Sequence, residues 1–118
     1  GAFTPTCSEK HLPSYVQHFE EFRKRGIEVF CVSVNDPFVM QAWGKTQHVP
    51  DGLQMLADGN ADLAKALGLE MDASAYGMGV RAKRFSLYAE DGVVKHVFVE
   101  APGEYKVSGA EHMLEQLG

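Results

Sequence analysis

Apolar residues recur at helical spacing between residues 8 and 25, which is the first regular pattern along the chain. The charged residues of this stretch lie mostly between the apolar ones, which are Leu12, Tyr15, Val16, Phe19 and Phe22. The pattern predicts one amphipathic helix whose apolar stripe packs into the core. We expect Pro13 to kink this helix or to separate its first turn, and Gly26 to end it.

A nearly continuous apolar run follows at residues 27–34 and is rich in β-branched side chains. It predicts a strand that is covered on both faces, as in a parallel sheet. Asp36 and Pro37 then predict a second helix, with Asp36 as its N-cap and Pro37 in its first turn. The apolar side of this helix is expected to consist of Phe38, Val39, Ala42 and Trp43.

Shorter elements are predicted after this helix. Residues 53–57 predict a strand, and residues 61–67 predict a third helix that Gly68 ends. Residues 70–79 show no clear period, so we expect a loop there.

The C-terminal part of the chain carries a hairpin signal and a helix signal. Two strand-like runs, residues 81–90 and 93–100, are joined by Asp91-Gly92, a dipeptide typical of tight β-hairpins. Residues 108–111, Ser-Gly-Ala-Glu, fit a capping box. They predict a last helix that carries Met113, Leu114 and Leu117.

Composition fits one domain spanning residues 1–118, long enough to bury a core. The net charge of −5 argues against nucleic acid or an anionic membrane as the main partner, because both favour basic surfaces. No signal peptide or long apolar span is visible, and the cysteines need no pairing, so a reducing, cytoplasmic location is expected. A targeting segment upstream of Gly1 stays compatible with this prediction.

Cys7 is the candidate reactive residue. The run Thr6-Cys7-Ser8-Glu9 fits a capping box, which would place Cys7 at the first helical position. The unpaired N–H groups and the dipole at a helix start favour the thiolate, the nucleophilic form. Thr4 offers a second hydroxyl to a substrate or to the thiolate. From these residues alone, the alternative of a buried, inert cysteine stays open.

The second cysteine and the histidines carry weaker signals. Cys31 lies in the apolar run of residues 27–34, so we expect a core residue with at most a minor redox role. Cys7 and His11 are spaced four residues apart and could share a zinc ion, but two ligands do not make a site. We therefore expect no metal site, and packing or local hydrogen bonding for His11.

Three separated motifs resemble one known family. Residues 1–8, Gly-Ala-Phe-Thr-Pro-Thr-Cys-Ser, with His11-Leu12-Pro13, resemble the active-site loop of peroxiredoxins, specifically of the peroxiredoxin-5-like or plant type II subgroup of the thiol-specific antioxidant family. The resemblance continues at residues 32–40 with Trp43, and again at residues 79–85. It therefore spans essentially the whole chain.

The resemblance implies a thioredoxin-like α/β fold, with a central mixed sheet flanked by helices. In that family a strand and a proline precede the cysteine loop, so the domain is expected to be N-terminally incomplete and the chain to be a piece of a longer protein. Family members form dimers through the active-site side. Phe3, Phe38 and residues 77–79 are accordingly expected to border the pocket or a dimer face.

The resemblance also implies the chemistry. Cys7 would be the peroxidatic cysteine, which reduces hydrogen peroxide and alkyl hydroperoxides and becomes a sulfenic acid. Thr4 would be its partner hydroxyl, Arg81 would contact both thiolate and peroxide, and Phe3 and Thr4 would help to bind the substrate. Arg84 would orient Arg81 or bind a surface carboxylate. No cofactor is implied.

No cysteine follows Cys31, so a C-terminal resolving cysteine is absent from this sequence. The resemblance then implies a one-cysteine cycle that glutathione with glutaredoxin, or thioredoxin, completes. Cys31 could resolve Cys7 only if the first helix moved. Two other readings stay open: a non-catalytic thioredoxin-fold redox sensor or holdase, and an inactive fragment.

Overall fold

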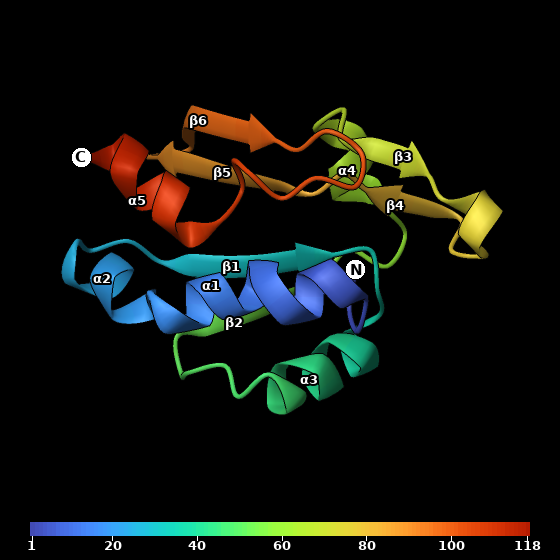
Figure 1. Ribbon diagram of the computed structural model, residues 1–118, viewed down its shortest axis with the longest axis horizontal. Coiled ribbons are helices and arrows are strands. Elements are labelled where there is room, and N and C mark those ends of the chain that lie inside the picture. Colours follow the sequence, from blue (N-terminus) through green and yellow to red (C-terminus); the bar gives the residue numbers. More distant parts are fainter.

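The computed structural model describes residues 1–118, and its N-terminal third forms three short helical segments (Figure 1). They are a π-helical turn η1 (Cys7–His11) and the α-helices α1 (Leu12–Gln17) and α2 (Phe19–Lys24). Pro13 lies in the first turn of α1, where its missing N–H costs nothing, so it separates the first turn as predicted. A second break at His18 was not predicted. Gly26 ends the segment with φ 74°.

Two parallel strands and one helix form the next unit. β1 (Val29–Ser33) pairs with β2 (Leu53–Ala57), and α3 (Pro37–Thr46) connects them. Asp36 caps α3 by accepting the Val39 N–H at 2.8 Å, as predicted. The predicted apolar side of α3 is wrong in part, because Phe38 is 82% exposed and Ala42 also faces solvent. Phe30 is 49% exposed, so β1 is not covered on both faces.

The predicted loop at residues 70–79 is wrong in part. After α4 (Asp62–Ala66), which Gly68 ends, β3 (Glu70–Asp72) pairs antiparallel with β4 (Val80–Ala82). The 3-10 turn η2 (Ser74–Tyr76) joins the two strands. The strands have only three residues each, too few to show an alternating pattern. Arg81 therefore lies on β4 rather than in the hairpin that follows.

The predicted hairpin is confirmed. β5 (Phe85–Glu90) and β6 (Val93–Val99) pair antiparallel, and Asp91 and Gly92 form the turn, both with positive φ. The last helix, α5 (Ala110–Leu117), is also confirmed, but its capping box is wrong. Its N-cap is Gly109, which has no side chain to cap the helix. The Ser14 hydroxyl oxygen accepts a hydrogen bond from the Ala110 N–H at 3.1 Å instead.

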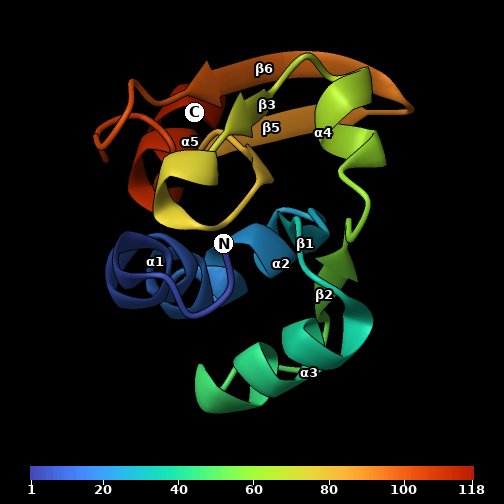
Figure 2. The same cartoon turned by 90° about the vertical axis from the view of Figure 1, so that its right-hand side faces the viewer.

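The strands form three two-stranded ladders in place of the single central sheet that was predicted, because no strand joins β1–β2 to β5–β6. Figures 1 and 2 place the β5–β6 ladder and α5 on one side, and β1–β2 with α3 on the other. Both views also place the N-terminus beneath the β3–β4 unit. The buried core joins the layers: Ala2, Leu12, Phe19, Phe22, Val29, Met40, Trp43, Leu53, Ala110 and Met113. No helix has the length and apolar character needed to cross a membrane.

Candidate active site

Cys7 lies half-buried in the first helical turns, but not at the predicted first position. Helical structure already begins at Pro5, and the Ser8 N–H donates to the Thr4 carbonyl at 2.9 Å. Thr6 has helical φ and ψ and makes no capping bond, so the predicted capping box is wrong. The physical reason is Pro5, whose fixed φ suits the first helical residue and moves the helix start upstream. Cys7 remains close to the N–H groups of the first turn.

The segment before the helix folds back onto the thiol. The Gly1 amino group donates to Cys7 Sγ at 3.1 Å, and the Thr4 hydroxyl donates to the Gly1 carbonyl at 2.6 Å. The Thr4 side chain is also one of the groups that lower the pKa of Cys7. Because a hydroxyl has one proton, its donation to the Gly1 carbonyl leaves none for the sulfur at the same moment. Phe3, between Gly1 and Thr4, has φ 61°, a strained backbone conformation for a bulky residue, and it is 52% exposed.

Arg81 reaches this segment from β4. Its Nε donates to the Met78 carbonyl at 3.0 Å, while its Nη1 is buried and has no hydrogen-bond partner. A Cβ at position 1 would lie 3.1 Å from Arg81 Nη1, so the guanidinium packs directly against Gly1. The structure thus brings together three side chains predicted from the sequence, those of Thr4, Cys7 and Arg81.

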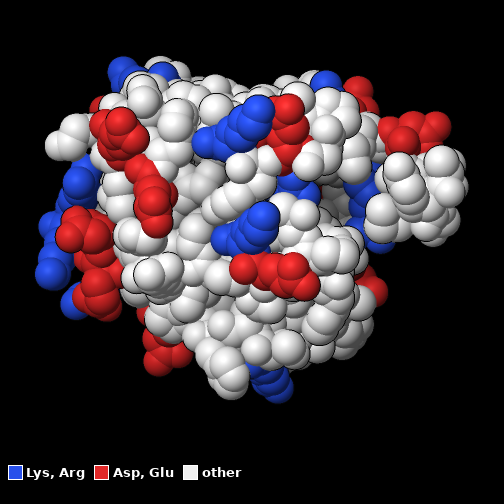
Figure 3. Space-filling view, in the orientation of Figure 1, with Lys and Arg blue, Asp and Glu red and all other residues white.

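Arg84 is a second arginine with an unused donor. Its Nη1 donates to the Glu104 carbonyl at 2.7 Å, and its Nε is buried without a partner. It binds neither Arg81 nor a surface carboxylate, contrary to the two roles expected for it. Figure 3 shows Lys or Arg side chains beside a hollow near the β3–β4 end of the molecule.

The two thiols differ strongly in acidity. Burial alone would raise the pKa of Cys7, but hydrogen bonds from His11, Thr4 and the Gly1 amino group, with the charge of that amino group, lower it to about 5. Burial raises the pKa of Cys31 to about 12, and Cys7 nearby adds to this effect. At neutral pH Cys7 is therefore a thiolate and Cys31 a thiol.

Two further side chains fix the first turns of the helix. The Trp43 indole on α3 donates to the Ser8 hydroxyl at 3.0 Å. The His11 ring meets the edges of Tyr15 and Tyr105, each with ring centroids 5.8 Å apart. Its Nε2 lies 3.1 Å from the Ser108 carbonyl. The sequence predicted local hydrogen bonding for His11, but gave no sign of this contact with a residue near the C-terminus.

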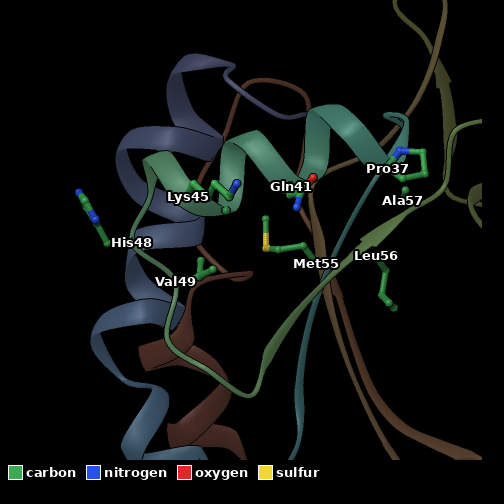
Figure 4. Close-up of a pocket in the computed structure, with 9 residues that line it drawn as sticks. Pro37, Gln41, Lys45, His48, Val49, Met55, Leu56 and Ala57 are labelled. Carbon is green, nitrogen blue, oxygen red and sulfur yellow. The ribbon is translucent and has the colours of Figure 1, made fainter.

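A separate cavity of about 710 Å³ lies between α3 and β2 (Figure 4). Met55 and Val49 point into this space, whereas His48 points outward. It contains no cysteine and lies apart from the thiol. Nowhere in the chain are three or more His, Cys, Asp or Glu side chains arranged to hold a metal ion.

Known proteins resemble this chain over nearly its whole length. A model of the redoxin family matches residues 1–114. Peroxiredoxin-2B of Arabidopsis thaliana is 47% identical over 118 residues, which cover 99% of this chain and 73% of that protein. The chain belongs to the peroxiredoxin family. Peroxiredoxin-2E-2, chloroplastic, of Oryza sativa subsp. japonica is 48% identical, and this chain spans 54% of its length.

A solved structure agrees with the assignment to the peroxiredoxins. Reduced Prx3 from Vibrio vulnificus in complex with hydrogen peroxide superposes with a TM-score of 0.94 at 47% identity, covering 100% of this chain and 76% of that one. The predicted family, its plant type II subgroup and the thioredoxin-like fold are therefore confirmed. Peroxiredoxins reduce peroxides with a cysteine thiol, so the predicted thiol peroxidase activity agrees with the family.

Proposed function

We propose that Cys7 is the peroxidatic thiol of this peroxiredoxin and reduces hydrogen peroxide and small alkyl hydroperoxides. The observation that carries this proposal is that Cys7, Thr4 and the buried, unpartnered Nη1 of Arg81 all lie against Gly1. The lowering of the pKa of Cys7 to about 5 supports it. The Cys7 sulfur attacks the terminal peroxide oxygen as the O–O bond breaks. Cys7 becomes a sulfenic acid, and the hydroxide or alkoxide takes a proton and leaves as water or an alcohol.

The neighbouring donors suit this reaction. The buried Nη1 of Arg81 can donate to the peroxide oxygens and stabilise the negative charge that develops on the departing one. The Thr4 hydroxyl can hold the attacked oxygen in line with the sulfur. Phe3 would cover the entrance to the Cys7 sulfur. The unpartnered Nε of Arg84 is a further hydrogen-bond donor. The reduced Vibrio vulnificus Prx3 in complex with hydrogen peroxide, a protein of the same fold, supports this assignment of substrate.

An external thiol is the proposed reductant. Cys31 packs against the core on β1, and its raised pKa leaves it protonated, so it is a poor nucleophile toward a Cys7 sulfenic acid. With no other cysteine in the chain, glutathione with glutaredoxin, or thioredoxin, would reduce the sulfenic acid. Cys31 remains a minor route that needs movement of the first helix.

The chain is also proposed to act as a homodimer in a reducing compartment such as the cytoplasm. Phe3, Phe38 and Tyr76 are exposed aromatic side chains that contact with a second copy would cover. Sedimentation velocity would measure the assembly. Two unpaired cysteines suit the cytoplasm, although relatives include proteins named chloroplastic and mitochondrial.

Stopped-flow oxidation by hydrogen peroxide tests the proposal. Cys7 should react at least about 10³-fold faster than a free thiol such as glutathione at the same pH, because thiolate formation and aligned donors both contribute. Recycling with glutathione and glutaredoxin, or with thioredoxin, should give repeated turnover. A rate equal to that of a free thiol would contradict the proposal, and a single stoichiometric oxidation without turnover would favour a redox sensor.

The Cys31→Ser variant is the matched control for this experiment. This variant should keep both the oxidation rate and the recycling rate within about twofold of the unsubstituted protein. The reason is that the Cys31 thiol it removes is protonated and packed against the core. Loss of recycling in this variant would show that Cys31 resolves Cys7.

A further inference from the structure

Asn35 is a half-buried amide side chain that ties the active-site segment to the end of β1. It lies two residues after β1 and directly before Asp36, the N-cap of α3. Its Oδ1 accepts the Ala2 N–H at 3.0 Å and the Ser33 hydroxyl at 2.6 Å. Because a backbone N–H can only donate, the atom that faces Ala2 must be the amide oxygen. Both lone pairs of this oxygen are therefore used.

Ser33 holds this amide in one orientation. It is the last residue of β1 and is 4% exposed, so the hydroxyl that donates to Asn35 lies in the interior. The Asn35 N–H donates in turn to the Ser33 carbonyl at 2.9 Å. These two contacts fix both the backbone and the side chain of Asn35. The oxygen that accepts the Ala2 N–H is therefore already in place, and no rearrangement is needed to present it.

The peptide group between Gly1 and Ala2 carries this contact into the site. In a trans peptide the N–H and the carbonyl point in opposite directions. The N–H donates to Asn35, and the carbonyl accepts the Thr4 hydroxyl at 2.6 Å and the Thr4 N–H at 3.2 Å. A Cβ on Gly1 would lie 3.1 Å from Arg81 Nη1. One peptide group therefore has Asn35 on one side and the side chains of Thr4 and Arg81 against the other.

The active-site segment needs such an anchor because its backbone is strained. Phe3 has φ 61°, and a residue in this region keeps its conformation only where its surroundings determine it. The Ala2 methyl packs in the core, but a methyl group does not fix the direction of the neighbouring peptide group. The hydrogen bond to Asn35 does fix that direction. Loss of this bond would leave the Ala2 N–H without its partner.

We propose that Asn35 is a positioning residue for the reaction with peroxide and acts on the Thr4 hydroxyl through the Gly1–Ala2 peptide group. The Asn35 oxygen fixes the peptide group, and the Gly1 carbonyl takes the proton of the Thr4 hydroxyl. The lone pairs of that hydroxyl are then free to accept a hydrogen bond from the incoming peroxide. The inference rests on the proposed roles of Cys7 and Thr4.

The alternative is that Asn35 only shapes the turn between β1 and α3. The second-order rate of Cys7 oxidation by hydrogen peroxide, measured by stopped flow on folded protein, separates the two roles. Asn35→Ala should lower this rate by about 5–30-fold, because the Thr4 hydroxyl loses its fixed position. Asn60→Ala, the same change at the other asparagine, which is exposed, should change the rate by less than about twofold.

A double-substitution cycle with Thr4→Val tests the route through Thr4, because valine keeps the shape of threonine and lacks its hydroxyl. In the Thr4→Val background, Asn35→Ala should change the oxidation rate by less than about twofold. The rate of Cys7 alkylation by iodoacetamide at neutral pH should stay within about twofold in Asn35→Ala, because alkylation needs no aligned peroxide. Equal losses of oxidation rate in both backgrounds, no loss at all, or a matching loss of alkylation rate would overturn the proposal.

Amide hydrogen exchange tests the anchoring without peroxide. Asn35→Ala should speed exchange of the Ala2 and Thr4 N–H groups by at least about 10-fold and leave the β5–β6 ladder unchanged. Unchanged exchange at both groups would overturn the anchoring even if Cys7 is the peroxidatic thiol. Slow oxidation of the unsubstituted protein would instead contradict the proposed function, and exchange would still decide the anchoring.

Should Asn35→Ala fail to fold, Ser33→Ala serves instead. It removes the hydroxyl that fixes the Asn35 oxygen and leaves the Ala2 bond possible. It should lower the oxidation rate by about 2–5-fold and lose this effect in the Thr4→Val background. An unchanged rate, or the same loss in both backgrounds, would overturn the proposal.

Discussion

The Cys7→Ser variant should lose peroxide turnover by at least about 10³-fold, because a serine hydroxyl stays protonated at neutral pH and is a far weaker nucleophile than a thiolate. The neighbouring hydrogen-bond donors surround an anion, and the serine hydroxyl supplies no anion. Measuring peroxide consumption with each recycling system would show the loss.

The fold of Cys7→Ser should survive. Cys7 is half-buried and the exchange changes little volume, so the free energy of unfolding should change by no more than about 1–2 kcal/mol. Circular dichroism and a urea titration check this. Turnover that persists in a folded Cys7→Ser protein would refute the assignment of the peroxidatic thiol.

The Arg81→Met variant should lower kcat/KM for peroxide by about 10²–10³-fold. This is the usual effect of removing one hydrogen-bond donor that stabilises the charge developing on the departing oxygen. Methionine keeps much of the side-chain length, so the packing against Gly1 is partly preserved. The pKa of Cys7 should change little, because Arg81 is not among the groups that lower it. Steady-state kinetics, together with the pH dependence of Cys7 alkylation by iodoacetamide, separate binding of the peroxide from activation of the thiol.

Lys83→Met is the matched control for Arg81, because it removes one positive charge from an exposed residue two positions away. It should change kcat/KM by less than about twofold, since exposed charges contribute little. If Arg81→Met behaved like Lys83→Met, Arg81 would have no role with peroxide. The same assay on Arg84→Met would then ask whether its unpartnered Nε is the donor that matters.

Features of the fold with a local cause could be predicted from the sequence. Asp36 caps its helix, Gly68 ends one, and Asp91-Gly92 turns a hairpin, because in each case the signal and the structure lie within a few residues. The capping box predicted at Thr6 is absent, although the sequence carried a stronger signal for the start of the helix. Pro5 directly precedes it and is a favoured first helical residue.

Features that depend on distant partners could not be predicted in the same way. β3 and β4 exist because they pair with each other, and neither three-residue strand has a pattern of its own. The site shows the same division. Thr4 and Cys7 share one short motif, and the family resemblance supplied Arg81, whereas the contact of His11 with Ser108 joins residues 97 positions apart.

The single tryptophan gives this protein a built-in optical reporter. Trp43 is 2% exposed, and its indole hydrogen-bonds Ser8, the residue next to the reacting sulfur. Indole fluorescence responds to the loss of such a bond and to the entry of water. A rearrangement of this turn on oxidation of Cys7 would therefore shift the emission spectrum without any added dye.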